Sequence, residues 1–427
     1  MSSMNSMERE QKKRQLKGRI IETSAATEQP AARRSYGENE EEVARRAERR
    51  SKHKRLRLFF ILVLILAIAG LAFVQYRKEH QFTAYTVAWE KQIPASESGF
   101  TEYVSFGENV LKYSKDGASY LDRSGNAVWS LSYQLKAPIC YVNGEYAVIA
   151  DQQGNAVYIC STAGCQGEAE TLLPILRVSV SAHGVTAALV EDSTASYITF
   201  FKADGSALDW GIKTVMSGNG YLMDVSLSPD GTQVMLSDLY LGDGSLKSRL
   251  VFYNFSEFGK SYPDRLVGGF DELGENISPR VRFLDEDHSC AFADGQIAFF
   301  SLENVTSPEL LKLAAVEEEI HAVAYSDKYV AVVTENLSGE FDSRLTLYRS
   351  DGSEVFSRDF TYAYQKIDID GDFVILYNDN SCRIYGTSGK ERFSGEFDFT
   401  VSKITRGLRF NSLLITGGDR MREIHLK

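Results

Sequence analysis

The chain has 427 residues, of which 43% are hydrophobic and 25% are charged, and its net charge is −11. This length is sufficient for a large domain with a sizeable core. The acidic balance argues against nucleic-acid binding, because nucleic-acid phosphates need a basic surface, so we expect no nucleic-acid partner.

The N-terminal part is basic, whereas the rest is acidic. Up to Arg57 there are 16 lysines and arginines against 9 acidic residues, a net of +7, which leaves −18 for the remainder. Residues 1–37 are polar and nearly free of aromatic side chains, so we predict a disordered cytoplasmic tail. In the basic juxtamembrane segment 38–57, pairs such as Glu41 with Arg45 indicate a solvated helix. This segment either binds anionic lipid head groups or serves only as a topology signal, and the second interpretation is favoured.

Residues 58–76 form the only long apolar run, and residues 58–74 contain no charged, amide or hydroxyl side chain. A helix that crosses a bilayer needs roughly 20 mostly apolar residues, so we predict a single transmembrane helix. The basic flank places the N-terminus in the cytoplasm and the large domain outside the cell membrane, with the lipid bilayer as a partner. A cleaved signal peptide is disfavoured, because the preceding segment is too long and no small-residue cleavage site follows.

From residue 81 to residue 427, short alternating apolar runs predict β-strands separated by turns rich in Gly, Asp, Asn and Ser. The strands recur as a four-strand unit, best seen in residues 139–160 and 367–385. First strands of the unit are expected near eight positions, spaced by about 36 to 56 residues: Val104, Cys140, Val178, Val225, Val281, Val323, Ile367 and Ile404. The fold class is therefore all-β, a β-propeller with eight blades; seven blades remain the alternative if the irregular region between Val225 and Leu313 is miscounted.

The two ends of this domain complement each other. The last unit stops after its third strand, residues 421–426, whereas residues 82–93 form a strand without a blade. Val87-Ala-Trp89 in this strand resembles Ala127-Val-Trp129, a predicted fourth strand. We therefore expect residues 82–93 to complete the last blade and close the ring, which removes an open sheet edge.

Repeated turn motifs carry a family resemblance. Gly125-x-x-x-Trp129 and two similar segments, Gly352-x-x-x-Phe356 and Gly389-x-x-x-Phe393, resemble the docking motif of quinoprotein-like eight-bladed propellers, and the turn at Ser228-Pro-Asp-Gly231 resembles WD40-like and TolB-type blades. With its N-terminal helix, the chain resembles an uncharacterised domain-of-unknown-function family of single-pass membrane-anchored propellers from Gram-positive Firmicutes. It lacks the adjacent cysteines and most tryptophans of quinoprotein enzymes, so the resemblance implies no quinone cofactor.

The sequence shows no catalytic, cofactor-binding or metal-binding constellation, and we assign no residue to such a site. The histidines beyond the apolar run lack metal-ligand spacing, and they are His80, His183, His288, His321 and His425. Asp368, Asp370 and Asp372 alternate around Gly371, but they lack the residue order of a calcium loop and are interpreted as a turn.

The five cysteines are an odd number, so at least one thiol has no partner within the chain. A disulfide between Cys160 and Cys165 is geometrically possible across a turn, and we leave it open. Cys140 and Cys382 lie within predicted strands and are interpreted as small buried hydrophobic residues.

We expect a non-catalytic platform that binds an extracytoplasmic protein, a cell-wall partner or another ligand. The alternative is an enzyme or small-molecule sensor whose site is assembled from loops of several blades, which sequence order would conceal. The irregular segments 239–247 and 262–279 are either blade distortions or binding loops.

Overall fold

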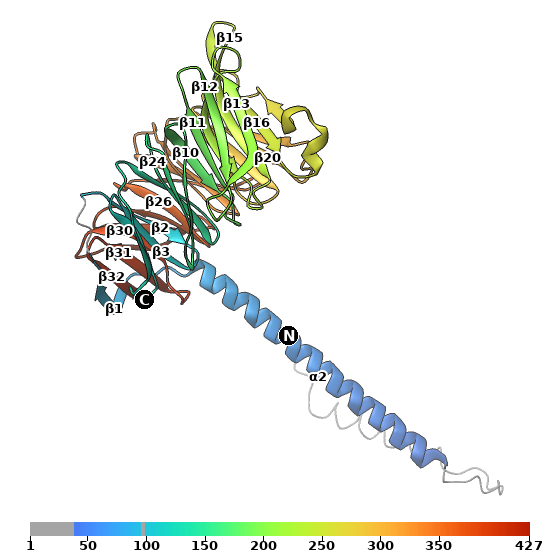
Figure 1. Cartoon of the computed structure of the whole chain (residues 1–427). Helices are drawn as coiled ribbons and strands as arrows, with labels where there is room; N and C mark the ends of the chain where they lie inside the picture. Colours follow the sequence, from blue (N-terminus) through green and yellow to red (C-terminus); the bar gives the residue numbers. More distant parts are fainter. Residues whose placement is uncertain (1–37, 95–98) are drawn as a thin grey trace, which may run out of the picture. The chain divides into compact units, whose positions relative to one another are not determined.

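The computed structural model describes residues 38–94 and 99–427, which form two units divided after Val74. The helix α2 (Glu38–Glu79) contains the predicted juxtamembrane and transmembrane segments (Figure 1). Counting only the residues that are described, no helix is both long and apolar enough to cross a membrane. The membrane-spanning role of residues 58–76 therefore stays a prediction, and the predicted disordered tail, residues 1–37, lies outside the described residues.

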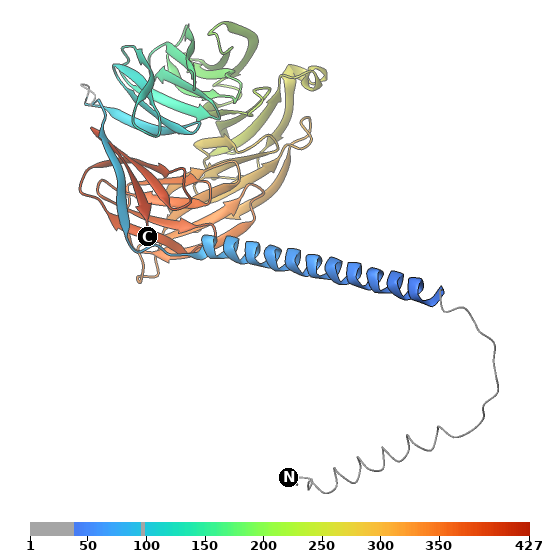
Figure 2. The same ribbon diagram turned by 90° about the horizontal axis from the view of Figure 1, so that it is seen from below.

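The second unit contains eight four-stranded antiparallel sheets, which confirms the eight-bladed propeller. The blades follow one another around a ring in the order of the sequence, from cyan to red (Figure 2). We number them from blade 1, β2 to β5, to blade 8, β30 to β32 with β1.

The first strand of each blade lies at the centre of the ring, and every predicted first-strand position falls within one of these strands. They are β2 (Thr101–Phe106), β6 (Pro138–Asn143), β10 (Ile175–Val180), β14 (Tyr221–Leu227), β18 (Arg280–Phe283), β22 (Ile320–Tyr325), β26 (Lys366–Asp370) and β30 (Val401–Arg406). The alternative of seven blades is thus wrong, because blades 4 and 5 are both complete.

The second and third strands form the middle of each blade and carry most of the core. The second strands are β3 (Asn109–Ser114), β7 (Tyr146–Asp151), β11 (Thr186–Glu191), β15 (Gln233–Gly242), β19 (His288–Ala293), β23 (Tyr329–Glu335), β27 (Phe373–Tyr377) and β31 (Ser412–Gly417). The third strands are β4 (Gly117–Leu121), β8 (Ala156–Ser161), β12 (Ala195–Phe201), β16 (Ser245–Asn254), β20 (Gln296–Ser301), β24 (Ser343–Arg349), β28 (Ser381–Gly386) and β32 (Arg420–Leu426). Second strands such as β27 are buried on both faces because they pack between neighbouring blades, which explains their continuous apolar sequences.

The fourth strands form the outer edge, and side chains in three of them, β5, β9 and β13, largely alternate between exposed and less exposed positions. They are β5 (Ala127–Ser132), β9 (Gly164–Glu170), β13 (Ala207–Val215), β17 (Leu266–Phe270), β21 (Glu309–Ala315), β25 (Glu354–Phe360), β29 (Glu391–Glu396) and β1 (Tyr85–Gln92). Strand β1 pairs with β32, so the strand that precedes the first blade supplies the fourth strand of the last one.

The repeated glycine turns dock each blade on its predecessor. Gly352 has φ of +79°, and a Cβ atom there would lie 2.7 Å from the ring of Phe299 in the preceding blade. Gly389 has φ of +76°, and a Cβ there would lie 2.9 Å from the ring of Phe356. Only glycine combines this backbone conformation with such a close approach, which explains the repetition of the motif.

Side chains on the inner strands also join neighbouring blades. Ser179 Oγ accepts a hydrogen bond from the backbone N–H of Leu227 at 3.1 Å, one blade further on, and Ser226 Oγ accepts one from the N–H of Phe283 at 2.9 Å. Asp370 likewise accepts the N–H of Arg406 at 2.7 Å. These bonds satisfy buried backbone donors and hold the inner strands around a common centre.

Candidate functional site: the central channel

All eight inner strands contribute side chains to one cavity of about 1180 Å³ at the centre of the propeller. Its size is comparable to the largest small-molecule sites, which usually measure about 300 to 1,000 Å³. We call this cavity the channel. Its lining includes five basic and five acidic residues, namely Arg177, Arg280, Arg282, Lys366, Lys403, Glu102, Asp224, Asp294, Glu319 and Asp368.

Irregular pairing between inner and second strands determines on which face of the sheet several of these residues lie. The register between inner and second strands shifts immediately before Arg177, before Asp224 and before Lys403, each time by one residue of the inner strand. Such bulges change the face on which the following side chains lie. The polar lining of the channel therefore depends on local departures from the two-residue alternation of a strand.

On one side of the channel, ion pairs between residues of different blades neutralise the charged side chains. Lys366 Nζ lies 2.8 Å from a carboxylate oxygen of Glu102, and Lys403 Nζ lies 2.8 Å from Asp368. The hydroxyl of Tyr377 also donates to Asp368 at 2.8 Å. The acids on this side accept hydrogen bonds from fixed partners, which leaves them poorly suited to act as general bases.

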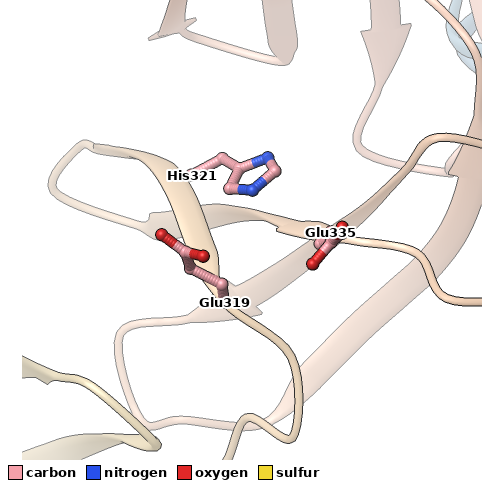
Figure 3. A group of neighbouring side chains, drawn as sticks. All are labelled: Glu319, His321 and Glu335. Carbon is pink, nitrogen blue, oxygen red and sulfur yellow. The ribbon is translucent and has the colours of Figure 1, made fainter.

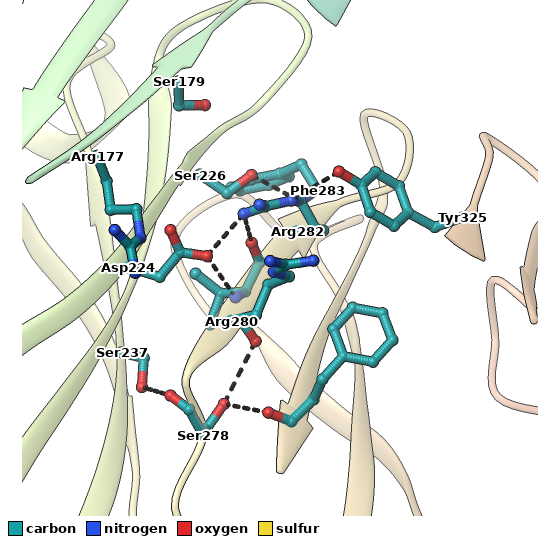
Figure 4. Close-up of polar contacts among 12 residues, drawn as sticks. Arg177, Ser179, Asp224, Ser226, Ser237, Ser278, Arg280, Arg282, Phe283 and Tyr325 are labelled. Carbon is teal, nitrogen blue, oxygen red and sulfur yellow. Dashed lines mark hydrogen bonds and ion pairs between the residues drawn. The ribbon is translucent and has the colours of Figure 1, made fainter. Parts of the chain in front are cut away.

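The opposite side is organised around Arg282 (Figure 4). Its Nη1 lies 2.7 Å from Asp224 Oδ2, and its Nε donates to the hydroxyl of Tyr325 at 2.8 Å. The guanidinium also lies over the rings of Tyr141 and Tyr325, at 5.2 and 5.6 Å from their centroids. Burial opposes the charge, but Tyr325, Asp224 and Tyr141 more than offset it, so the pKa of Arg282 stays well above its ordinary value. These contacts join blades 2, 4, 5 and 6.

The channel thiol is a poor nucleophile. Burial raises the pKa of Cys140 to about 12, so this side chain stays protonated at neutral pH. It is partly rather than fully buried, whereas Cys382 is buried as predicted. The Cys140 thiol is therefore not activated as a nucleophile.

A group of possible metal ligands that was not predicted from the sequence lies at the edge of the channel (Figure 3). Glu319, His321 and Glu335 each offer a ligand atom, and these atoms lie within 4.8 Å of one another. Pairing of β22 with β23 shifts between Ile320 and Ala322, which makes His321 a bulge residue. The sequence has no closely spaced histidines here, because this group combines one histidine with two carboxylates from the two sides of a hairpin. The pairing register of β22 with β23, which determines which residues lie opposite each other, is the feature that would have indicated this group.

The other predicted candidates are separate from this group. Asp368 and Asp370 lie in strand β26 and not in the predicted turn, which consists of Gly371 and Asp372 alone. Asp368 faces Lys403, whereas Asp370 accepts a backbone N–H, so these carboxylates have different partners. His288 Nδ1 lies 2.9 Å from Asp285, and His425 Nε2 lies 3.9 Å from Glu423. Neither histidine belongs to the group at the channel edge.

The irregular segments 239–247 and 262–279 both belong to the region of blade 4. Strands β15 and β16 form a hairpin that extends to the pair Gly242 and Ser245, and its side chains Leu241 and Leu246 are 73% and 51% exposed. Two short 3₁₀ helices, η1 (Phe258–Ser261) and η2 (Pro263–Arg265), precede β17. The hairpin at β15 and the yellow 3₁₀ turns project from the propeller (Figure 1).

Cys160 and Cys165 are directly opposite each other in the pairing of β8 with β9, and both are free thiols. The predicted proximity is therefore present, but the disulfide is not formed. A hydrogen bond from the Cys160 thiol lowers the pKa of Cys165 to about 7, although burial acts in the opposite direction. The same interaction, together with burial, raises the pKa of Cys160.

Alkylation of Cys165 by iodoacetamide should therefore rise with pH through a midpoint near 7. In a Cys160→Ala variant the hydrogen-bond donor is gone, so the midpoint should move up toward about 8.5, the value of an ordinary thiol. At pH 7 the wild-type thiol should react a fewfold faster, because its larger thiolate fraction outweighs its lower intrinsic nucleophilicity. Mass spectrometry of the modified peptide measures both profiles. Identical midpoints in the two proteins would contradict the assigned cause.

Comparisons with known proteins give a family and a fold. A family model described as "Family of unknown function (DUF5711)" matches residues 78–426. None of the curated proteins matches the chain. Among solved structures, the computationally designed Ika8 protein has a TM-score of 0.53 at 13% identity, over 81% of this chain and 100% of that chain. This likeness supports the fold alone.

Two natural proteins resemble the chain more weakly. BamB from Moraxella catarrhalis has a TM-score of 0.49 at 11% identity, over 80% of this chain and 100% of that chain. Sqt1 from Chaetomium thermophilum, solved bound to the N-terminus of the ribosomal protein L10, has a TM-score of 0.48 at 13% identity, over 82% and 97% of the two chains.

Proposed function

Because this chain belongs to DUF5711, a family of unknown function, we propose its function from the channel: the propeller is a non-catalytic binding platform, anchored to a membrane, that receives its partner at the channel mouth. One observation carries the proposal. Eight strands converge on a large polar cavity in which three ion pairs neutralise acids and bases, namely Lys366 with Glu102, Lys403 with Asp368 and Arg282 with Asp224. Acids and bases that neutralise each other in ion pairs suit recognition better than proton transfer.

The anchor is part of the proposal and rests on the helix and on charge. The described residues from 58 to 73 are exposed, and their large apolar side chains range from 45% exposed at Val63 to 71% at Leu71. A helix that is apolar on all sides needs an apolar environment, either a protein core or a membrane. The net charge of +7 up to Arg57 favours a cytoplasmic N-terminus and an extracytoplasmic propeller.

Topology is tested by labelling intact cells with a membrane-impermeant maleimide. We expect Cys165 to react without permeabilisation. A Cys165→Ala variant that carries Ser51→Cys should react only after the membrane is opened. The reverse labelling pattern would overturn the proposed orientation, and recovery of the chain in the soluble fraction would overturn the anchor.

The platform is tested by cross-linking the full chain in the cells that make it. Ala322 lines the channel and is partly buried, so Ala322→Trp narrows the channel. Ala207 is exposed on the outer strand β13, and Ala207→Trp is the matched control. We expect a specific set of cross-linked extracytoplasmic partners to be lost with Ala322→Trp and kept with Ala207→Trp. The same partners with both variants, or none with any protein, would contradict the proposal.

A second candidate function, an enzyme or metal-dependent sensor, is favoured by the group Glu319, His321 and Glu335. One imidazole and two carboxylates suit a divalent transition metal. Calorimetric titration of the full chain with Zn²⁺ tests this alternative. Saturable binding at one site that is abolished by His321→Ala, but not by His183→Ala at an exposed position, would favour it. Unsaturable binding, or equal binding by both variants, would argue against it.

A further inference from the structure

We infer that the channel contains a subsite for a single oxyanion group, a carboxylate or a phosphate, held by Arg177 of β10 and Arg280 of β18. This inference rests on the proposed function, since it names the chemical class of the group that the channel receives. The observation behind it is an excess of positive charge on one side of the cavity. Arg177, Arg280 and Arg282 lie around the carboxylate of Asp224, and all four residues line the channel (Figure 4).

Asp224 is already used by other partners. Its Oδ2 accepts hydrogen bonds from Arg282 Nη1 at 2.7 Å and from the backbone N–H of Val281 at 3.0 Å. The Arg282 and Asp224 side chains are 11% and 4% exposed, so this pair is fixed within the wall. One carboxylate thus neutralises one arginine, and the charges of Arg177 and Arg280 are left over.

Arg177 and Arg280 have no carboxylate within 4.0 Å among the described residues. Within the described part of the chain, the one side-chain hydrogen bond of Arg177 runs from Nη1 to the carbonyl of Leu176 at 2.9 Å. The side chain of Arg280 makes no ion pair or hydrogen bond within residues 38–94 and 99–427, and both arginines are exposed to the channel. In a domain with a large excess of acids, these two arginines, which lie on either side of Asp224 and have no ion-pair partner among the described residues, form an open cationic site (Figure 4).

The remaining lining limits what this site accepts. A guanidinium presents a planar fork of donors that matches carboxylate and phosphate oxygens. Asp294 and Glu319 also line the channel, and they form no ion pair with either arginine. These acids repel an extended polyanion such as a nucleic acid, so the ligand that fits has one local oxyanion group.

Arginine modification tests the subsite directly in the full chain. Phenylglyoxal is applied to the protein in detergent, alone, with inorganic phosphate or with acetate, and modified peptides are quantified by mass spectrometry. We expect phosphate, acetate or both to slow modification of Arg177 and Arg280 at least fivefold. Arg349, which is exposed outside the channel, should react equally in all samples. Protection by one probe alone assigns a phosphate or a carboxylate group, respectively. No protection by either, or equal protection of Arg349, would overturn the inference.

Substitution gives the second measurement. The variant Arg177→Gln/Arg280→Gln should weaken binding of the protecting probe at least tenfold in calorimetric titration, whereas Arg349→Gln should leave it unchanged. Unchanged circular dichroism and melting temperature show that the double variant is folded. If the folded double variant binds the probe as tightly as wild type, the subsite is not at these arginines.

The same variant separates this inference from the proposed function. Partners that are lost with Ala322→Trp but kept with Arg177→Gln/Arg280→Gln would preserve the platform and overturn the oxyanion subsite as its recognition element. Partners lost with both variants would support the two together. Partners kept with both would overturn the platform, and phosphate or acetate protection would then remain as evidence for the subsite alone.

Discussion

A chain that begins at Ile93 should unfold with a free energy at least about 5 kcal/mol lower than one that begins at Gln81, because it lacks β1. Strand β1 pairs with β32 from Tyr85 to Gln92, and Trp89 Nε1 donates to Glu423 at 2.8 Å. Phe82, just before the strand, is only 4% exposed. Without this segment, a core aromatic side chain is lost and β32 becomes an open sheet edge. Urea denaturation followed by circular dichroism measures the difference.

Point variants in the full chain distinguish the contribution of core packing to the free energy of unfolding from that of strand pairing at the sheet edge. Ile93 is 5% exposed and packs with Tyr103 of the first blade and Leu414 of the last, so Ile93→Ala should cost about 2 to 4 kcal/mol. Val87 is 49% exposed, and Val87→Ala should cost less than about 1 kcal/mol. If the truncated chains unfold at the same urea concentration, β1 does not stabilise the ring.

The closing strand illustrates how much of the fold the sequence reveals. Its segment Val87-Ala-Trp89 resembles Ala127-Val-Trp129 of another fourth strand, and the last unit in the sequence lacks a fourth strand. The inner strands were equally predictable, because the turn and strand pattern recurs in each blade and needs only local information. The long hairpin of β15 and β16 departs from this recurring pattern, which is why the sequence left seven blades as an alternative. Blade 4 nevertheless keeps all four strands.

The chemistry of the channel was not predictable in this way. Arg177, Asp224 and Arg282 come from three different blades, so nothing in their sequence spacing indicates that they meet. Bulges before Arg177 and Asp224 also break the alternation from which the face of a side chain is deduced. The group at His321 was missed for the same reason, since a bulge and a hairpin partner bring its ligands together.

Replacing Asp224 by alanine should lower the free energy of unfolding by about 3 to 5 kcal/mol, because it leaves the charge of Arg282 buried without its carboxylate. It also removes the acceptor of the Val281 N–H. The double variant Asp224→Ala/Arg282→Met should lose clearly less than the sum of the two single variants, since removing both partners leaves no unpaired charge. Urea denaturation of the four proteins measures this coupling.

A half-buried ion pair with the same N–O distance is the control for the effect of full burial. Arg344 Nε lies 2.7 Å from Asp359, as Arg282 lies 2.7 Å from Asp224, but the Arg344 and Asp359 side chains are 38% and 33% exposed. Water screens this pair, so Asp359→Ala should cost less than about 1 kcal/mol. Equal losses for Asp224→Ala and Asp359→Ala would show that the channel wall is solvated around Arg282. A large difference would mean that the buried pair of Arg282 and Asp224 contributes to the stability of the ring itself.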